Sequence, residues 1–366
     1  MINNKKIAVV VPAYNEEAQI GLVLDGMPAF VDRIIVVNDA SRDRTADIVL
    51  DRINAASKID TTVVRKPGRL KRTRYNEADV LVQVTAQKEH QYFTPSKITN
   101  NSPETDRIIL ITLESNSGVG AAIAHGYKWC MDHQIDCTAV MAGDGQMDPA
   151  ELESVVMPVV SGEVDYVKGN RLIHRSAWFV IPRIRYFGNS ILSILTKISS
   201  GYWRVSDTQC GYTAISLKAL NSIRLHDIYP RYGMPNDLLV KLNIAFCTLK
   251  EVEIKPVYRV GEMSKMRIST VIPRIAWLLF TCFFKRLWIK YLFRDFHPLF
   301  LLYHFAFLLG LLMLPYAVKI AKLFWYGRQV SYETLLVFIF LAISGFQALL
   351  FAMWMDMQDN ERYYRS

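Results

Sequence analysis

The sequence contains few cysteines and no spacing of cysteine or histidine that is typical of a structural metal site. Five of its 366 residues are cysteine, and neither these nor the seven histidines repeat at the short intervals of zinc ligands. A cytoplasmic setting would also keep the thiols reduced. We therefore expect core thiols without disulfides, and we expect the histidines, His125 and His174 among them, to be structural or solvent-exposed.

Formal charge is absent from two stretches near the C-terminus. They run from Pro298 to Val318 and from Thr334 to Met355, and each reaches the roughly 20 residues that a helix needs to cross a bilayer core. Neither shows the polar face of a helix in a soluble protein, although buried helices are the alternative. The first apolar run, residues 7–11, is too short for a signal peptide. These patterns predict two transmembrane helices and no cleaved leader.

Basic residues outnumber acidic ones by nine. This excess suits a protein that binds phosphates or anionic lipid, and because no motif combines basic with aromatic residues as nucleic-acid-binding proteins do, we expect no nucleic-acid partner. More cations precede the first predicted span than lie between the two spans. They are Lys285, Arg286, Lys290 and Arg294 before it, and Lys319, Lys322 and Arg328 between. The positive-inside rule then places the N-terminal domain and both termini in the cytoplasm.

Short β-branched runs alternate with helical patterns in the N-terminal half. The expected strands are residues 6–14, 33–39, 107–115 and 137–144, and the expected helices are 16–27, 44–53 and 121–133. This alternation predicts an α/β domain with a mostly parallel sheet. Polar turns at 15–16, 38–39 and 143–144 follow three of the strands, at the sheet edge where such domains bind their ligands.

Two segments depart from this alternation. Residues 55–106 include six basic residues within 65–74 and a polar run at 94–106. We expect a solvated, partly disordered insertion there, with a basic arm that contacts anionic headgroups as the alternative. Residues 268–296 are rich in aromatic side chains and flanked by cations, but their uncharged runs are too short to span a bilayer. They predict amphipathic helices that lie in the membrane interface.

Seven motifs follow one another between about residues 5 and 268. They are VPAYNEE, VNDASRDRT, NSGVGAAIAHGY, AGDGQMDP, KGNR, DTQCGYTAIS and GEMSKMRI. In this order they resemble the family 2 glycosyltransferases of GT-A (Rossmann-like) fold, and most of all the polyprenyl-phosphate branch, which is similar to dolichyl-phosphate mannose or glucose synthases. The resemblance implies inverting transfer of a sugar from a nucleotide diphosphate sugar to polyprenyl or dolichyl phosphate, with Mg²⁺ or Mn²⁺ as cofactor. A UDP-sugar is favoured as donor, and GDP-mannose is second.

The resemblance also implies which residues bind the nucleotide and the metal. The nucleotide-binding positions are Pro12, Tyr14, Glu16, Asp39, Gly118 and Asp144. Asp144 and Gln146 match the D-x-Q motif, whose oxygen atoms bind a divalent cation that bridges the diphosphate. Most relatives have another aspartate at the position of Ala142, so one carboxylate is missing here. Asn15 and Asp39 could also cap the helices that follow them.

A phosphate acceptor needs placement and neutralisation more than a general base. Its second pKa is about 6, so it is largely a dianion at neutral pH, and arginine binds such a group through its bidentate fork. By resemblance, Arg171, Arg183 and Arg185 bind the acceptor phosphate. The alternative is a solvated cationic face.

Further residues are implied on the donor side of the site. The donor sugar and diphosphate positions are Asp207, Gln209, Gly211, Ser264, Lys265 and Arg267. Asp237 stands where many family members keep the second acid of an acidic pair, and Asn236 replaces the first. We assign Asp237 a contact with the donor sugar or a base-like role, with helix capping as the alternative. The expected catalytic residues are therefore Asp144, Asp237 and Arg171.

The expected architecture has four parts. They are a cytoplasmic GT-A domain at 1–262, a diphosphate loop with interfacial helices at 263–297, two transmembrane helices at 298–355 and a cytoplasmic tail at 356–366. The spans would contact the bilayer and the isoprenoid chain and could form a homo-oligomer. Two other functions stay open, namely transfer to a hydroxyl of a glycolipid or polysaccharide with Asp237 as base, and a non-catalytic nucleotide-sugar-binding scaffold. A transporter component is poorly supported, because neither span carries a charge.

Overall fold

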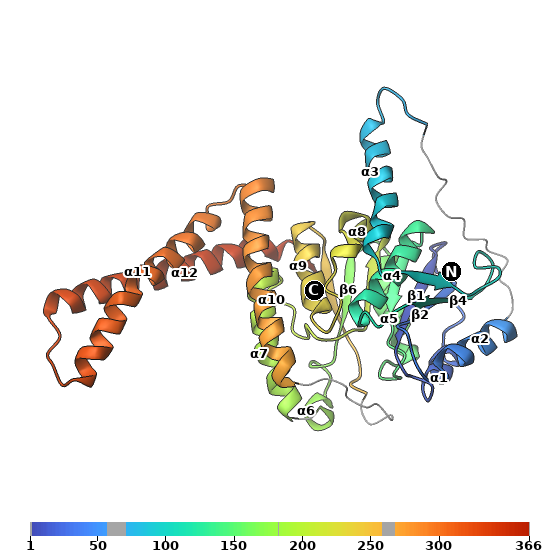
Figure 1. Ribbon diagram of the computed structural model, residues 1–366, viewed down its shortest axis with the longest axis horizontal. Helices are drawn as coiled ribbons and strands as arrows, with labels where there is room; N and C mark the ends of the chain where they lie inside the picture. Colours follow the sequence, from blue (N-terminus) through green and yellow to red (C-terminus); the bar gives the residue numbers. More distant parts are fainter. Residues whose placement is uncertain (1, 57–70, 182, 258–267, 366) are drawn as a thin grey trace.

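A computed structural model describes residues 2–56, 71–181, 183–257 and 268–365, without the side chains of 86–87, 183–187 and 268–271. It shows an α/β domain from which two long helices, α11 (Leu299–Trp325) and α12 (Tyr332–Glu361), extend together as an arm (Figure 1). The chain returns from this arm, and its C-terminus lies against the α/β domain (Figure 1).

The remaining elements follow the predicted alternation of strands and helices. The strands are β1 (Ile7–Ala13), β2 (Arg33–Asn38), β3 (Ser96–Ile98), β4 (Ile108–Leu113), β5 (Cys137–Val140), β6 (Tyr166–Asn170), β7 (Thr213–Ser216), β8 (Leu249–Glu253) and β9 (Tyr364–Arg365). The longer helices are α1 (Ile20–Asp25), α2 (Thr45–Ala55), α3 (Glu77–Lys88), α4 (Val119–Asp132), α5 (Leu152–Val160), α7 (Arg183–Ser200), α8 (Leu217–Ser222), α9 (Met234–Ile244) and α10 (Ile268–Trp288). The short helical turns are η1 (Glu89–Tyr92), η2 (Pro149–Glu151), α6 (Ala177–Val180), η3 (Leu225–Asp227) and the π-helix η4 (Ile289–Arg294).

The strands form one sheet in the order β3-β4-β2-β1-β5-β7-β6-β8-β9. The run β4-β2-β1-β5 is parallel, and so is the run β6-β8-β9. Only β3 and β7 run against their neighbours among the described strands. The predicted α/β fold with a mostly parallel sheet is confirmed.

The central strands are apolar along their whole length because helices cover both faces of the sheet. Every residue of β1 and β2 is buried. Alternate side chains of β1 enter two separate cores, since successive residues of a strand point to opposite faces. Ala8 and Val10 pack with residues of α4, α8 and α9, whereas Val9 and Val11 pack with residues of α1, α2 and α5.

The five cysteines are free and buried, as expected from the sequence. Burial raises the pKa of the Cys130 thiol to about 12, so this thiol stays protonated at neutral pH. We therefore assign the cysteines a packing role.

The insertion at 55–106 is more regular than predicted. Its second half forms α3, η1 and β3, and β3 pairs with β4 as the edge strand of the sheet. His125 of α4 fixes this segment, because its Nε2 lies 2.9 Å from the carbonyl oxygen of Thr94 and the ring of Phe93 packs edge-on against the imidazole. Helix α3 itself projects from the domain (Figure 1). Most of the basic stretch lies outside the described residues.

Helices α11 and α12 are long and apolar enough to cross a membrane. Only 28% and 11% of their most apolar windows are buried within the molecule, so the alternative of two core helices does not describe this arrangement. At roughly 1.5 Å per residue, each is longer than the roughly 30 Å hydrocarbon core of a bilayer. Helix α12 continues past Met355, the end of the predicted span, to Glu361.

Helix α4 packs closely against the middle of the sheet at Gly126. A Cβ atom at this position would lie 2.3 Å from Cγ1 of Val10 in β1, which is well inside van der Waals contact. The short distance between this helix and β1 therefore depends on the absence of a side chain at residue 126.

We expect Gly126→Ala to destabilise the protein. Alanine favours a helix by about 1 kcal/mol over glycine, but an added methyl group in a packed core costs about 1–3 kcal/mol, so the clash outweighs the propensity. Thermal unfolding of the detergent-solubilised protein measures the effect. In the control Gly188→Ala on α7, no atom of the described residues lies within 4 Å of the added Cβ. An equal loss of stability in both variants would contradict the packing argument.

Candidate functional site

The strand register brings the predicted site segments to one edge of the sheet. The carboxyl ends of β1, β2, β4 and β5 share this edge because the four strands are parallel. Val140, the last residue of β5, faces Thr213, the first residue of the antiparallel β7. Lys168 near the end of β6 faces the same Thr213. The segment before β7 and the segment after β6 therefore also reach this edge.

The turns after β1 and β2 are bound to each other. The backbone N–H of Asn15 donates to Oγ of Ser41 at 3.0 Å, and that of Glu16 donates to Oγ1 of Thr45 at 2.9 Å. In return Oδ1 of Asn15 accepts the N–H of Arg42 at 2.9 Å. Asn15 thus joins two loops, and the alternative that it caps the following helix is wrong, because α1 begins after Gln19.

Asp39 organises the turn between β4 and α4. Its two carboxylate oxygens accept the N–H groups of Ser117 at 2.7 Å and Gly118 at 2.8 Å, and the residue is 3% exposed. Gly118 has a φ of 98°, and a Cβ there would lie 2.5 Å from the carbonyl oxygen of Pro230. Asp39 and Gly118, both predicted to bind the nucleotide, are therefore hydrogen-bonded to each other. Glycine is required at residue 118 by the turn and by packing against Pro230.

The AGDGQMDP segment forms a fastened turn after β5. Oδ1 of the partly exposed Asp144 accepts the N–H of Gln146 at 3.1 Å. The N–H of Gly143 donates to the carbonyl oxygen of Pro12 at 3.2 Å, which holds the turn against β1. On the other side the hydroxyl of Tyr212 donates to the carbonyl oxygen of Asp148 at 3.0 Å. The turn is therefore held by the ends of both neighbouring strands.

The donor atoms of this turn fit a divalent cation that is bound mainly by its substrate. Within the described ranges, no group of three or more His, Cys, Asp or Glu residues could hold a metal ion on its own. Mg²⁺ commonly uses one or two carboxylates and completes its shell with water and phosphate oxygens. Asp144 and Gln146 have side-chain oxygens of this kind, and their role as metal ligands stays a prediction.

Arg171 and Asp207 form an ion pair at the same edge. Nε of Arg171 donates to Oδ2 of Asp207 at 2.8 Å and Nη2 donates to Oδ1 at 3.1 Å, in the bidentate geometry of strong arginine–carboxylate pairs. The Asp207 side chain is fully buried. Burial alone would raise the pKa of its carboxyl, but Arg171 and the nearby Lys168 hold it below the ordinary value of 3.8. A residue predicted to bind the acceptor phosphate is therefore held by one predicted to line the donor site.

Gln209 and Asn236 connect the segment before β7 to α9. Nε2 of Gln209 donates to Oδ1 of Asn236 at 2.8 Å, and the same oxygen accepts the hydroxyl of Thr196 in α7 at 3.1 Å. Gly211 lies against the AGDGQMDP turn, because a Cβ there would be 3.2 Å from Cε of Met147. Helices α7 and α9 thus both contact the site segments.

Asp237 is already bound within the protein. Its Oδ2 accepts the N–H of Tyr229 at 2.8 Å and also the ammonium of Lys241, while Sγ of Cys282 in α10 lies 3.8 Å from Oδ1. The residue is 5% exposed. The helix-capping alternative is wrong, because Gly233 occupies the capping position of α9. Asp237 instead fixes the loop before the helix.

Comparison with known proteins gives the family. The family model described as glycosyl transferase family 2 matches residues 8–78 and 91–224, which is more than half of the chain. The chain belongs to glycosyltransferase family 2. It is therefore an enzyme of the transferase class, as the seven motifs predicted.

Individual relatives agree with this family. A UDP-N-acetylglucosamine–dolichyl-phosphate N-acetylglucosaminyltransferase of Methanococcus voltae is 27% identical over 268 residues, which are 72% of this chain and 90% of the relative. A dolichyl-phosphate beta-glucosyltransferase of Trichomonas vaginalis is 23% identical over 300 residues, 77% of this chain and 74% of the relative. Their names confirm the resemblance to the dolichyl-phosphate branch. A structure of glucosyl-3-phosphoglycerate synthase from Mycobacterium tuberculosis with Mn²⁺ and UDP has a TM-score of 0.47 at 18% identity, covering 77% of this chain and 80% of the other.

Some predicted site residues of the glycosyltransferase cannot be placed. Arg183 and Arg185 belong to the first turn of α7, but their side chains are outside the described part of the structure. Ser264, Lys265 and Arg267 lie outside the described residues altogether. Their roles remain predictions, as do the domain boundaries.

Two charged residues beside the site, the buried Lys168 and the half-buried Glu251, were not predicted. Nζ of Lys168 donates to the carbonyl oxygen of Cys210, and Glu251 accepts the N–H groups of Ser206 at 2.9 Å and Asp207 at 3.1 Å. Burial lowers the pKa of Lys168 and raises that of Glu251. Lys168 stands in the KGNR motif, which was a usable signal, whereas Glu251 lies in a strand with no motif around it.

We expect Asp207→Asn to destabilise the glycosyltransferase strongly. The substitution leaves Arg171 without its carboxylate partner, and breaking a buried pair in this way costs about 3–5 kcal/mol. Denaturant unfolding at neutral pH measures the loss. Asp25→Asn is the matched control, because the Asp25–Arg52 pair is exposed and such pairs contribute about 0–1 kcal/mol.

The same pair sets a pH dependence with a defined sign. Because the folded-state pKa of Asp207 is depressed, its contribution to stability is complete above 3.8 and is lost as the pH falls further. The stability difference between the wild type and Asp207→Asn should therefore be constant near neutral pH and shrink in acid. A difference that shrinks on going above neutral pH instead would refute this assignment.

Proposed function

We propose that this glycosyltransferase transfers a sugar from a nucleotide diphosphate sugar, preferably a UDP-sugar, to polyprenyl or dolichyl phosphate at a membrane surface. Transfer would be inverting and dependent on Mg²⁺ or Mn²⁺. The names of the two relatives above support this choice of acceptor. The structural observation that carries it is the polarity of α7.

Helix α7 has its polar side chains inside and its apolar side chains outside. The hydroxyl residues Ser193, Thr196 and Ser199 are buried, at 4%, 0% and 2% exposure. Ile191, Ile194 and Leu195 face outward, at 64%, 58% and 41%. A helix at a water-facing surface has the opposite pattern. An outward apolar face suits contact with the hydrocarbon of a bilayer, while the inward hydroxyls of Ser193 and Thr196 contact Thr208 and Asn236 of the site segments.

Neighbouring helices extend this apolar surface. Helix α10 packs along α7 and lies between the sheet and the arm (Figure 1). It exposes Trp277, Phe280 and Trp288, and α6 exposes Trp178 and Phe179. Tryptophan is enriched at membrane–water interfaces. We propose that α6, α7 and α10 lie in the interface, and that α11 and α12 cross the bilayer beside them.

The return of the chain supports the proposed topology. Strand β9 pairs with β8 at the edge of the sheet, so the residues after α12 lie on the same side as the α/β domain. If the cation bias of the sequence orients the domain as predicted, two spans put both termini in the cytoplasm. The groove of about 770 Å³ between α11 and α12 is lined by apolar residues, including Phe307 and Phe346, and offers the isoprenoid chain a surface. A homo-oligomer through these helices remains a prediction.

The site residues would place the reactants and neutralise their charge. When bound at Asp144 and Gln146, the divalent cation would stabilise negative charge on the departing diphosphate. Asp39 fixes the turn at Gly118 beside the nucleotide positions. Arg171, oriented by Asp207, and the first turn of α7 supply cations for the acceptor phosphate. A dianionic phosphate attacks without losing a proton, so none of these residues needs to act as a base.

The rival acceptor, a sugar hydroxyl, requires a general base. Asp237 is the candidate, but its Oδ2 is occupied by the N–H of Tyr229 and by Lys241. An oxygen that already accepts hydrogen bonds from two donors is poorly placed to take a proton from a sugar hydroxyl. These contacts favour the phosphate acceptor over the hydroxyl. The non-catalytic scaffold has no comparable observation in its support, because Asp144 is present.

We expect label from a UDP-sugar to enter an organic-extractable lipid when membranes that contain the enzyme are given polyprenyl phosphate. The phosphate dianion is the nucleophile, so a dephosphorylated polyprenol should accept nothing. GDP-sugars tested in parallel identify the donor base. Labelling of a glycolipid or polysaccharide, with none in polyprenyl phosphate, would instead support the hydroxyl acceptor.

We expect Asp144→Ala to abolish transfer. Losing roughly 3 kcal/mol of metal-assisted charge stabilisation lowers the rate about 100-fold or more. Initial rates with added Mg²⁺ or Mn²⁺ measure the effect, and Asp51→Ala on the exposed side of α2 is the control. Near-normal turnover of Asp144→Ala would refute the metal assignment.

A further inference from the structure

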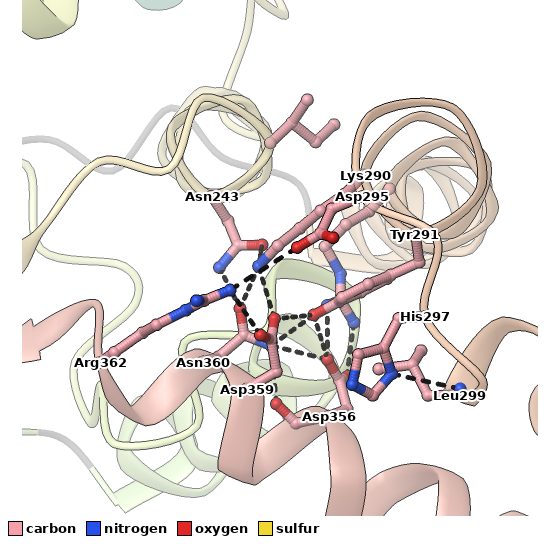
Figure 2. A network of polar contacts seen from close by, with 12 residues as sticks. Asn243, Lys290, Tyr291, Asp295, His297, Leu299, Asp356, Asp359, Asn360 and Arg362 are labelled. Carbon is pink, nitrogen blue, oxygen red and sulfur yellow. Dashed lines mark hydrogen bonds and ion pairs between the residues drawn. The ribbon is translucent and has the colours of Figure 1, made fainter.

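A buried polar cluster joins the end of α12 to the α/β domain. Figure 2 shows side chains from α9, from η4 and from α12 converging on one another, and Arg286 of α10 binds Asp356 in the same cluster. We call this cluster the C-terminal clasp. Its members are Asn243, Arg286, Lys290, Tyr291, Asp356, Asp359 and Asn360. It combines cations from the chain before the arm with acids from the last turns of α12.

Arg286 and Asp356 form the centre of the clasp. Both side chains are 0% exposed. Nη1 donates to Oδ1 and Nη2 donates to Oδ2, each at 2.7 Å. The guanidinium also donates from Nε to the carbonyl oxygen of Ser199 at 2.9 Å, and from Nη2 to that of Ile198 at 3.0 Å. Arg286 therefore ties α12 to the C-terminal end of α7.

The backbone leaves room for this arginine at Gly201. This glycine has a φ of 80°, and a Cβ there would lie 2.6 Å from Nη1 of Arg286. The end of α7 is thus shaped around the ion pair.

Lys290 makes a second connection, to α9. Its ammonium donates to Oδ1 of Asn243 at 3.1 Å and to Oδ1 of Asn360 at 2.6 Å, and it lies 3.3 Å from Oδ2 of Asp359. The rings of Tyr291 and Tyr363 lie 4.9 and 4.6 Å from it, within range of cation–π attraction. Burial lowers the pKa of Lys290 to about 8, against the attraction of Asp359.

The clasp and the candidate site share two helices. Ser199 lies one helical turn from Thr196, whose hydroxyl contacts Asn236. Asn243 and Asp237 belong to the same helix, about 9 Å apart along its axis at roughly 1.5 Å per residue. Helix α12 is therefore fastened to the C-terminal ends of α7 and α9, and both of these helices contact the site segments. A change in the tilt of the arm would therefore act directly on α7 and α9.

Buried ion pairs are a poor means of gaining stability but a good means of selecting one geometry. Apolar residues of similar size often stabilise a fold as well, whereas a charge pair is satisfied in only one arrangement. The clasp holds two cations and two acids where apolar packing would suffice. Its composition indicates that orientation, rather than net stability, is what it provides.

We propose that the C-terminal clasp sets the position of the catalytic site relative to the membrane helices, and that Arg286, Lys290 and Asp356 are positioning residues for transfer to an acceptor anchored in the bilayer. This inference rests on the proposed function. A short, water-soluble acceptor diffuses into the site from any side, so it needs no fixed arm. A long-chain acceptor is held by the bilayer and reaches the site only at one height and tilt.

The test compares the two acceptors with the full-length enzyme in liposomes. We expect Asp356→Asn to lower kcat roughly tenfold or more with long-chain polyprenyl phosphate, since misplacing reactants by about 1 Å can cost about 100-fold. Binding of the nucleotide and transfer to a short prenyl phosphate should stay at wild-type levels. Asp295→Asn is the matched control, because this nearby acid is 61% exposed and its ion pair with Arg362 is long, at 3.9 Å. It should change the transfer rate with neither acceptor.

A double variant separates positioning from folding. Arg286→Met with Asp356→Leu replaces the ion pair by apolar side chains, and we expect it to regain the thermal stability that Asp356→Asn loses while long-chain transfer stays low. Recovery of both stability and long-chain transfer would overturn the proposal. So would equal losses with the two acceptors, or no loss with either.

Failure of the proposed function would look different. A wild type that binds the nucleotide sugar but modifies neither prenyl phosphate would overturn the acceptor assignment on which the inference depends. If Asp356→Asn loses nucleotide binding but the double variant keeps it, the rates of the double variant with the long-chain and the short acceptor decide whether the proposal holds.

Discussion

The site depends on the reversed direction of one strand. Strand β7 runs against β5 and β6, so the residues before it meet the residues that follow its two neighbours. With a parallel β7, Asp207 and Gln209 would lie at the opposite edge of the sheet from Asp144 and Arg171. The Arg171–Asp207 pair, and the contact of Gly211 with Met147, exist because of this single reversal.

A second constraint acts on the helices that cover this edge. Helix α7 must satisfy polar groups of the site on one side and, in the proposed function, hydrocarbon on the other. Ser193 and Thr196 point inward to Thr208 and Asn236, and Ile191 and Ile194 point outward. At the C-terminal end of this helix, Arg286 of the C-terminal clasp donates hydrogen bonds to the carbonyl oxygens of Ile198 and Ser199. It thereby connects α7 to the arm. In the proposed function, the same turns of α7 thus contact the membrane on one side and the site segments on the other.

The local sequence pattern predicted the parts of the fold that depend on residues close together in the chain. The strands of the sheet centre could be recognised because burial on both faces demands continuous apolar runs, and the polar turns at their ends followed from their position. Asp144 and Asp39 were found in this way. The partners of these residues could not be found, since Asp39 accepts from Ser117 and Gly118 across about 80 positions of chain. The order of the strands carries that information, and no local pattern encodes it.

The same reason explains the features that sequence reasoning missed. Strand β3 is too short and too polar to read as a strand, and it exists because β4 offers an unpaired edge. Asp356 lies at the boundary of a predicted span and reads there as the start of a tail. Its burial against Arg286 requires the chain to return over the domain, which depends on the length of α11 and α12 rather than on any residue near Asp356.

Ala142 connects metal binding to substrate binding in the proposed reaction. A cation held by Asp144 without a second carboxylate keeps more of its positive charge, which strengthens its attraction for the diphosphate and weakens its hold on the protein alone. The metal and the nucleotide sugar would then bind as one unit. The rest of the turn needs no acid at this position, because the N–H of Ala142 points to Sδ of Met147 at 3.3 Å and the turn is held by Pro12 and Tyr212. The fold of the turn is therefore independent of a carboxylate at residue 142, and in the proposed reaction only the strength and order of metal binding would depend on it.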